Sequence, residues 1–238
     1  EILCSKIDAL DISITGSVSP CAPTPVTNST ATITQEGIYC VAEPITTPLN
    51  IQSSNVDLDL NGYDIGMGVD VASGLNNVRI QNGTVRPSTD QVCVQVNANA
   101  RSIYIQNVQT IGGELGIDIQ EGAHNIVIEN VRLQNGDQGL RINQGYKVTV
   151  SNAIASCNAL SGFELISSYT NCFKDCKALS TGSGNSTVTN AEIFGFVSNN
   201  GADNIFERCI ANATQALSTT DSNSLVAGFA LRGSEQCT

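Results

Sequence analysis

The sequence has little charge, few aromatic rings and no long apolar run. Charged residues make up 14% of the 238 residues, hydrophobic residues make up 41%, and tryptophan is absent. A chain with this much apolar content can bury a core, so intrinsic disorder is excluded. No apolar stretch approaches the roughly 20 residues that a helix needs to cross a bilayer, so we expect no membrane span.

Basic residues are also scarce. Lysine and arginine together number 11, against 22 aspartates and glutamates, which gives a formal net charge of −11. A surface this acidic repels phosphate backbones, so we expect no nucleic-acid partner.

Histidine is nearly absent, whereas cysteine is abundant. The sequence has one histidine, His124, and nine cysteines, none of which are paired at C-x-x-C spacing. Zinc sites use such spacings, so we expect no metal site and no cofactor. Nine cysteines favour disulfide bonds in an oxidising compartment, which predicts a secreted or surface location. The odd number leaves at least one thiol free or bonded to another chain.

The feature that organises the chain is a repeat, seen in Gly116-Ile117-Asp118-Ile119. A glycine before alternating apolar residues occurs at positions 68, 116, 139, 162, 195 and 228, and Cys93 takes the glycine place in one further copy, so the steps are 25, 23, 23, 23, 33 and 33 residues. A second motif follows each copy eight or nine residues later: Asn77-Val78, Ser102-Ile103, Asn125-Ile126, Lys147-Val148, Asn171-Cys172 and Asn204-Ile205. Two motifs kept in phase at such a period indicate a solenoid.

The repeated runs are short, rich in β-branched residues and interrupted by glycine and asparagine, which favours strands. Each strand would pair in parallel with its copies about 4.8 Å above and below, so equivalent residues would stack in columns. We predict an all-β, single-domain parallel β-helix, a β-solenoid of about seven rungs, over residues 34–238. Residues 1–33 would form a strand and an irregular cap or arm.

Residues 36–65 carry a more specific signal. The order Gly37-Ile38-Tyr39-Cys40, then an apolar strand, then SNVDLDLNG from Ser54 to Gly62, resembles the opening coils of secreted right-handed parallel β-helix proteins of the pectin-lyase-like superfamily. The resemblance extends over roughly residues 35–235 and implies a right-handed coil. It specifies the fold rather than an activity, because many proteins with this opening have no established function.

One column of the predicted coil is rich in asparagine. Four residues after the apolar residue of the second motif, four consecutive copies have an asparagine and the next two have Cys176 and Cys209. We predict an inward ladder of amides bonded from rung to rung at Asn82, Asn107, Asn130 and Asn152. Cysteines on neighbouring rungs have their Cα atoms within disulfide reach, so we predict a Cys176–Cys209 bond, with two stacked buried thiols as the alternative.

Asparagine also begins four Asn-X-Ser/Thr sequons, at Asn28, Asn82, Asn185 and Asn212. A glycan on Asn82 would not fit in an inward ladder, which leaves the other three as possible glycosylation sites.

The first strand of the repeat has its own outward column: Asp70, Gln95, Asp118, Arg141, Glu164, Val197 and Ala230. We expect Asp118, Arg141 and Glu164 to form a surface charge ladder, in which exposed pairs contribute only ~0–1 kcal/mol each.

The last two steps are about ten residues longer than the others, because of insertions at 181–194 and 213–227. Both should emerge at one corner, where solenoid insertions often carry the function. Half a rung follows Gly228, and an open solenoid end exposes unpaired backbone groups. Either the N-terminal arm or an insertion folds over an end, or another copy stacks there through these residues: Ile2, Leu3, Cys4, Ile7, Leu10, Ile12, Ile14 and Cys237.

The resemblance also implies motifs for polysaccharide cleavage, and the sequence departs from them. The hydrolases of the superfamily have Gly-His-Gly and Arg-x-Lys, whereas this chain has no glycine after His124 and no lysine two residues after Arg141. The lyases use an acidic calcium cluster with a basic residue, whereas Asp57 and Asp59 are joined by no other acid pair at their level. We therefore assign no catalytic residue.

These observations favour a secreted or surface structural protein that self-assembles end to end into a filament or extracellular layer. The alternatives are a polysaccharide-active β-helix enzyme, either lyase or hydrolase, and a glycan-binding adhesin that uses the two insertions. The expected partners are other copies of the chain and, for the adhesin, surface glycans.

Overall fold

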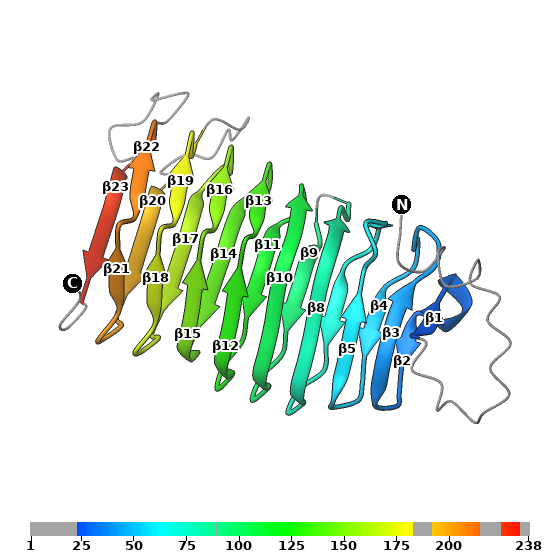
Figure 1. The fold of residues 1–238 in the computed structure, drawn as a ribbon. Helices are drawn as coiled ribbons and strands as arrows, with labels where there is room; N and C mark the ends of the chain where they lie inside the picture. The colour runs from blue at the N-terminus through cyan, green and yellow to red at the C-terminus, as the bar shows by residue number, and fades with distance from the viewer. Residues whose placement is uncertain (1–22, 89, 183–191, 215–224, 234–238) are drawn as a thin grey trace, which may run out of the picture.

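The alternating runs form strands that pair only in parallel (Figure 1). The structure, a computed structural model, describes residues 23–88, 90–182, 192–214 and 225–233. In these ranges the one helical element is a 3₁₀ turn, η1 (Asn28–Thr30), and there is no α-helix. No helix here has the length and apolarity to cross a membrane.

Two sheets make up the coil. The 14-stranded sheet contains β1 (Thr24–Val26), β3 (Gly37–Val41), β5 (Val56–Asp59), β8 (Asn76–Val85), β10 (Arg101–Ile111), β12 (His124–Glu129), β15 (Tyr146–Ser151), β18 (Cys172–Lys174) and β21 (Ile205–Glu207). The shorter strands β6 (Asp64–Ile65), β13 (Arg132–Gln134), β16 (Ile154–Ser156), β19 (Lys177–Leu179) and β22 (Ile210–Asn212) branch from it.

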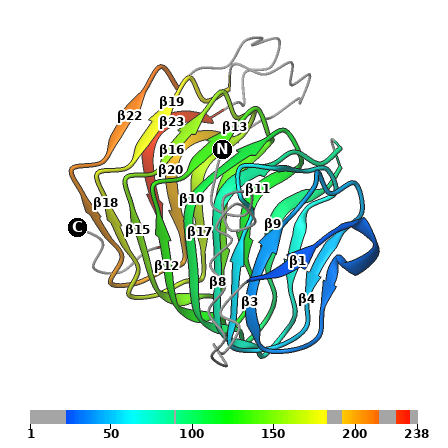
Figure 2. The same ribbon diagram turned by 45° about the vertical axis from the view of Figure 1, so that its right-hand side comes forward.

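The 9-stranded sheet takes one strand from each turn: β2 (Thr32–Ile33), β4 (Leu49–Ile51), β7 (Val69–Val71), β9 (Val92–Val96), β11 (Leu115–Ile119), β14 (Gln138–Asn143), β17 (Ser161–Ile166), β20 (Glu192–Asn199) and β23 (Leu225–Arg232). Figure 2 brings the first rungs toward the viewer, with the later rungs stacked behind them. The predicted single-domain β-solenoid of about seven rungs is confirmed. The pairing begins before the predicted boundary at residue 34, because β1 already pairs with β3 and β2 with β4.

Inward residues stack in columns that form one continuous core. In the 9-stranded sheet, one column holds Val69, Val94, Ile117, Leu140, Phe163, Phe196 and Phe229. Where that column changes from aliphatic to aromatic, the column of the short strands changes to Ala155, Ala178 and Ala211. The smaller alanine compensates for the larger ring, so the cross-section of the core stays filled.

The glycine of the repeat is required by close packing between rungs. A Cβ on Gly116 would lie 2.4 Å from the carbonyl oxygen of Gly139, and a Cβ on Gly139 would lie 2.4 Å from that of Gly162. Neither residue has a positive φ, so the constraint is steric rather than conformational. This accounts for the regular return of glycine that identified the repeat.

The inward orientation predicted for the asparagine ladder is wrong. Asn107, Asn130 and Asn152 are exposed and Asn82 is half-buried, and all four have φ between 52° and 61°. Asparagine tolerates this left-handed conformation better than most residues, so the column marks a turn of the coil. One rung-to-rung amide bond is present on its outer side, from Asn107 Nδ2 to Asn82 Oδ1 at 3.1 Å.

A buried asparagine pair does exist, in a column that the sequence pattern concealed. Strand pairing aligns Cys172 with Thr149, so Asn171 occupies the inward place of Val148, and Asn204 occupies the same place one rung later. Asn171 Oδ1 accepts the Val148 N–H at 2.9 Å, and Asn171 Nδ2 donates to Asn204 Oδ1 at 3.0 Å. The second motif is therefore displaced by one residue in the last two rungs.

The same displacement moves Cys176 and Cys209 one column away from Asn152, into the place of Ala153. In the structure both are free thiols, as are Cys93, Cys157 and Cys172, whereas Cys40 is disulfide-bonded. Cys176 and Cys209 thus show the alternative arrangement, two stacked thiols, and a bond between them stays a prediction.

The flanks of the two insertions lie together, and the common corner of the insertions stays a prediction. Ser180 N–H, after β19, donates to Asn212 O at the end of β22 (2.9 Å), and Glu192 pairs with Leu225 at the starts of β20 and β23. Most of each insertion, at 183–191 and 215–224, lies outside the described residues.

Replacing Gly116 with alanine should lower the free energy of unfolding by about 3 kcal/mol, because the obstructing atom is a backbone oxygen that cannot rotate away. Gly228 is the matched control, since its added Cβ would meet only Ala211 Cβ, at 3.2 Å. Gly228→Ala should cost less than about 1 kcal/mol. Urea denaturation followed by circular dichroism measures both variants, and equal losses would contradict the steric explanation.

Candidate binding site

The outer face of the 14-stranded sheet carries a row of different side chains on four consecutive strands. Strand register places Ile38, Asp57, Arg79 and Tyr104 side by side on β3, β5, β8 and β10. Asp57, Arg79 and Tyr104 point outward because the residues on either side of each, such as Val78 and Ile103, are buried in the core.

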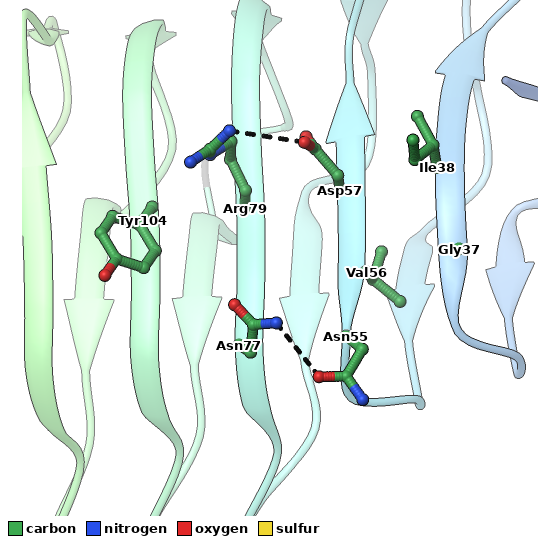
Figure 3. A pocket seen from close by; sticks show the side chains of 8 residues that line it. All are labelled: Gly37, Ile38, Asn55, Val56, Asp57, Asn77, Arg79 and Tyr104. Atoms are coloured by element: carbon green, nitrogen blue, oxygen red, sulfur yellow. Dashed lines mark hydrogen bonds and ion pairs between the residues drawn. The ribbon is translucent and has the colours of Figure 1, made fainter. Parts of the chain in front are cut away.

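These side chains line a groove of about 250 Å³, which we call the Tyr104 groove (Figure 3). Its lining residues are Gly37, Ile38, Asn55, Val56, Asp57, Asn77, Arg79 and Tyr104. Figure 3 shows two rows across the strands, with the ring and the charged groups in one row and the amides of Asn55 and Asn77 in the other.

Arg79 lies between an acid and a ring. Its Nη1 is 3.4 Å from Asp57 Oδ2, and its guanidinium carbon is 5.7 Å from the centre of the Tyr104 ring. The Arg79 side chain is 45% exposed and that of Asp57 is 35% exposed, so the ion pair contributes little to stability. Both charged groups and the ring therefore remain accessible to a ligand.

One amide immediately precedes β5, and the other lies at the start of β8. Asn55 and Asn77 both have φ of 58°, and Asn77 Nδ2 donates to Asn55 Oδ1 at 3.1 Å. Asn55 Nδ2 donates in turn to Glu36 Oε2 at 3.2 Å. The groove thus combines an aromatic ring with a fixed line of hydrogen-bonding groups.

A second groove, of about 290 Å³, lies beyond the asparagine turn, where β8 and β10 continue and β13 begins. Its lining includes Asn107, Gln109, Asn130 and Arg132. Gln109 Nε2 donates to Gln134 Oε1 at 2.7 Å, so one amide is already engaged. The two grooves therefore lie on opposite sides of this turn.

The expected surface charge ladder is stacked as predicted, but it is not fully exposed. Asp118 is 1% exposed and accepts two hydrogen bonds from Arg141, from Nε at 2.9 Å and from Nη2 at 3.0 Å. Gln120 Nε2 also donates to Asp118. The Asp118 contact raises the pKa of Arg141. Both oxygens of this buried carboxylate therefore already accept hydrogen bonds from neighbouring side chains.

Glu164 follows Arg141 in the same column. Burial raises its pKa above the ordinary value, although a hydrogen bond from Gln138 Nε2 at 2.7 Å and the charge of Arg141 act in the opposite direction. Val197, next in the column, is 1% exposed, so this face is covered there.

The other residues singled out in the sequence are dispersed. His124 lies in neither groove: its ring stacks on Tyr146 with centroids 4.6 Å apart, and its Nδ1 is 3.0 Å from Gly122 O. No group of three potential metal ligands occurs in the part of the chain that the structure describes. The residues proposed for assembly, Ile2 to Ile14 and Cys237, lie outside it.

The sequons differ in availability. Asn28 Nδ2 donates to Glu43 Oε1 and Pro44 O, and its Oδ1 accepts the Thr46 N–H at 2.7 Å, so its amide is already engaged. Asn212 is exposed at the end of β22, and Asn185 lies outside the described residues. Glycosylation at these three positions stays a prediction.

Sequence reasoning missed Arg79 and Tyr104, although the signal was present. Both follow directly after the apolar residue of the second motif, so the outward column of that motif reads Asp57, Arg79, Tyr104 and Val127. Reading the outward columns of both motifs would have placed a ring beside a guanidinium.

No protein-family model and no curated protein matches the chain. Solved structures do match. The enzymatically active domain of bacteriophage CBA120 tailspike protein 2 is 17% identical with a TM-score of 0.56, over 84% of this chain and 31% of that one. PfbA, a surface adhesin of Streptococcus pneumoniae, is 12% identical with a TM-score of 0.51, over 84% of this chain and 68% of that one.

The catalytic domain of a GH87 alpha-1,3-glucanase, solved in complex with nigerose, is 14% identical with a TM-score of 0.50, over 92% of this chain and 46% of that one. The chain has the right-handed parallel β-helix fold. This β-helix spans about a third of the tailspike domain and less than half of the glucanase domain. Because these sequence identities are below 25%, the matches establish the fold alone. That fold is the one predicted from the resemblance to the pectin-lyase-like superfamily.

Glu164→Gln should stabilise the β-helix near neutral pH and have no effect near pH 4. The pKa of Glu164 is higher in the folded state than its unfolded value of about 4.3. Between these two pKa values, the native state binds more protons than the unfolded state. Stability therefore falls as pH rises through that window, and glutamine removes the loss. Urea midpoints of both proteins across this range measure the effect.

Asp175→Asn is the control with the opposite sign, because Arg208 lowers the pKa of Asp175. It should lower the midpoint near neutral pH and lose this effect as the solution is acidified. A Glu164→Gln variant that behaves in the same way would contradict the assignment.

Proposed function

We propose that this β-helix is an extracellular or cell-surface module that binds a neutral glycan along the outer face of its 14-stranded sheet. The observation that carries the proposal is the Tyr104 groove, where a ring, a guanidinium and two amides meet across neighbouring rungs. Sugars present hydroxyl groups on their edges and C–H groups on their faces, and the groove offers partners for both.

Charge favours a neutral ligand over an acidic one. The chain carries a net charge of −11, which repels polyanions at long range. Within the groove, Asp57 already faces the guanidinium of Arg79, and Gln81 Nε2 donates to the other oxygen of Asp57 at 3.2 Å. No uncompensated positive charge lines the Tyr104 groove to attract a carboxylate.

The contacts of the two acids near the groove support binding rather than cleavage. Asp57 is engaged by Arg79 and Gln81, while Asp59 accepts the Asn61 N–H at 2.7 Å and Asn82 Nδ2 at 3.0 Å. A glycosidase needs one carboxyl group free to protonate the leaving oxygen, and both acids here are held as acceptors.

The solved structures of similar fold lend support to this class of function. One is a surface adhesin, one is an enzymatically active tailspike domain and one is a glucanase catalytic domain with a bound disaccharide. Surface proteins and glycan-active proteins thus both use this fold.

A microarray of neutral and acidic glycans tests the proposal directly. We expect signal on neutral glycans that is insensitive to sodium chloride. Tyr104→Ala and Arg79→Met should each weaken binding of the best neutral oligosaccharide by about fivefold in calorimetry, because stacking and hydrogen bonds of this kind contribute about 1 kcal/mol each.

Tyr146→Ala is the matched control, since Tyr146 lies outside both grooves, and it should bind normally. Signal restricted to acidic glycans, or absent from the array, would contradict the proposal. If the protein releases new reducing ends from a glycan, and Asp57→Asn or Asp59→Asn abolishes this release, the function would be cleavage rather than binding.

Association of two copies is a second candidate, favoured by apolar side chains on the last described rung. Among the described strands, β21, β22 and β23 each pair along one edge, and the exposed apolar residues on them are Ile205, Ile210, Leu225, Val226, Phe229 and Leu231. At the first rung, by contrast, Val26 and Ile33 are 1% and 2% exposed. A filament would need an apolar surface at both ends, so this asymmetry favours contact through the last rung.

Leu231→Asp should abolish any concentration-dependent association in sedimentation velocity, because Leu231 is 53% exposed at this end. Ile38→Asp is the control, since Ile38 is similarly exposed, at 55%, on the outer face of the coil. Equal behaviour of the two variants would exclude this end as the contact.

A further inference from the structure

Two thiols face each other across neighbouring rungs near the end of the coil. Cys176 lies between Lys174 and Lys177, which pair with Glu207 and Ile210 on either side of Cys209. Paired residues of parallel strands lie about 4.8 Å apart. Disulfide bonds join Cα atoms about 4.4–6.8 Å apart, so the backbone already has the required spacing.

The two side chains also point in the same direction. Cys176 Sγ lies 3.6 Å from Val150 O, and Cys209 Sγ lies 3.5 Å from Phe173 O. Phe173 is the copy of Val150 one rung later, so the two thiols take equivalent positions. The interaction between the two thiols raises the pKa of Cys176 and lowers that of Cys209.

The Cys176–Cys209 pair is partly accessible to solvent, whereas the thiol of Cys93 is not. Cys209 is half-buried, so an external reagent can reach its sulfur, whereas Cys176 is fully buried beneath it. Cys93 is also fully buried, and its pKa is raised to about 12 by desolvation, so it is inert at neutral pH.

We propose that Cys176 and Cys209 form an oxidation site, whose disulfide bond joins the last described rung to the rung before it. The oxidant is a low-molecular-weight disulfide such as oxidised glutathione. The Cys209 thiolate attacks one sulfur of this disulfide and releases one glutathione thiolate. Cys176 then loses its proton and attacks the Cys209 sulfur, which releases the second glutathione. The pair loses two electrons and two protons, and the oxidant becomes two thiols.

The bond would act where the coil has least support. Among the strands that the structure describes, β21 and β22 have a neighbour on one side only, and Ile205 and Ile210 are exposed on them. Strands with few neighbours open first in a solenoid. A covalent link from Cys209 to the buried Cys176 would hold this terminal rung against the interior.

Trypsin gives a direct test, because lysine and arginine isolate the two cysteines. Cleavage releases Cys176 in residues 175–177 and Cys209 in residues 209–232, while Cys157 and Cys172 share residues 148–174. The native protein is incubated with oxidised and reduced glutathione, blocked with N-ethylmaleimide at low pH, unfolded, digested and analysed by mass spectrometry. We expect the 175–177 peptide linked to the 209–232 peptide, at about 2 Da below the sum of the two.

A link from either peptide to residues 148–174, or Cys209 found only as a glutathione adduct, would overturn the proposal. The Cys157→Ser variant is the control and should give the same link, because Cys157 is exposed and belongs to another column.

Hydrogen exchange provides a second measurement that separates cross-linking from folding. Oxidation should slow amide exchange in β21 and β22 by at least about tenfold in the wild-type protein, and leave β12 unchanged. The Cys209→Ser variant should show no response to the oxidant. Two results would show that the pair does not hold the rung. One is that oxidation slows exchange equally in Cys209→Ser, and the other is that exchange in the cross-linked wild-type protein is unchanged.

Discussion

Stacking each residue on its own copies, one rung apart, is the constraint on which this structure depends. Apolar residues satisfy it easily, because a column of valine, isoleucine and leucine packs as well between rungs as within one. Polar residues can satisfy it when neighbours in a column bind each other. Two columns show this arrangement, with Arg141 bonded to Asp118 and Asn171 bonded to Asn204. A buried amide without a neighbouring amide would cost more than it contributes.

Side chains on the outer face of the 14-stranded sheet stack with the same spacing between rungs, but they are not required to bind each other. Its columns meet solvent, so neighbouring rungs are free to carry unlike side chains. Asp57, Arg79 and Tyr104 are such a series, and their close spacing follows from the rungs rather than from any loop. A site built in this way is as rigid as the coil that carries it, which favours recognition of an extended polymer with its own regular repeat.

The fold could be predicted from sequence because the repeat is enforced by backbone contact. Gly116 and Gly139 cannot be replaced without collision, so their spacing records the length of each rung. The asparagine column was placed on the wrong face, because asparagine suits both inward amide ladders and left-handed turns. The displacement at Asn171 was hidden since Asn171-Cys172 imitates the motif Asn125-Ile126. The Tyr104 groove depends on a combination of unlike residues that no periodicity marks.

The compensation between aromatic and alanine columns gives each rung an individual shape. Phe163, Phe196 and Phe229 stack with centroids 4.7 Å and 4.6 Å apart, and the edges of Phe173 and Phe206 meet them from the opposite sheet. If the strand that carries Phe163 were shifted by one rung toward the N-terminus, its ring would pack against Leu133 instead of Ala155. The rungs with aromatic cores therefore could not be exchanged with the aliphatic rungs before them, although all are made from the same pattern.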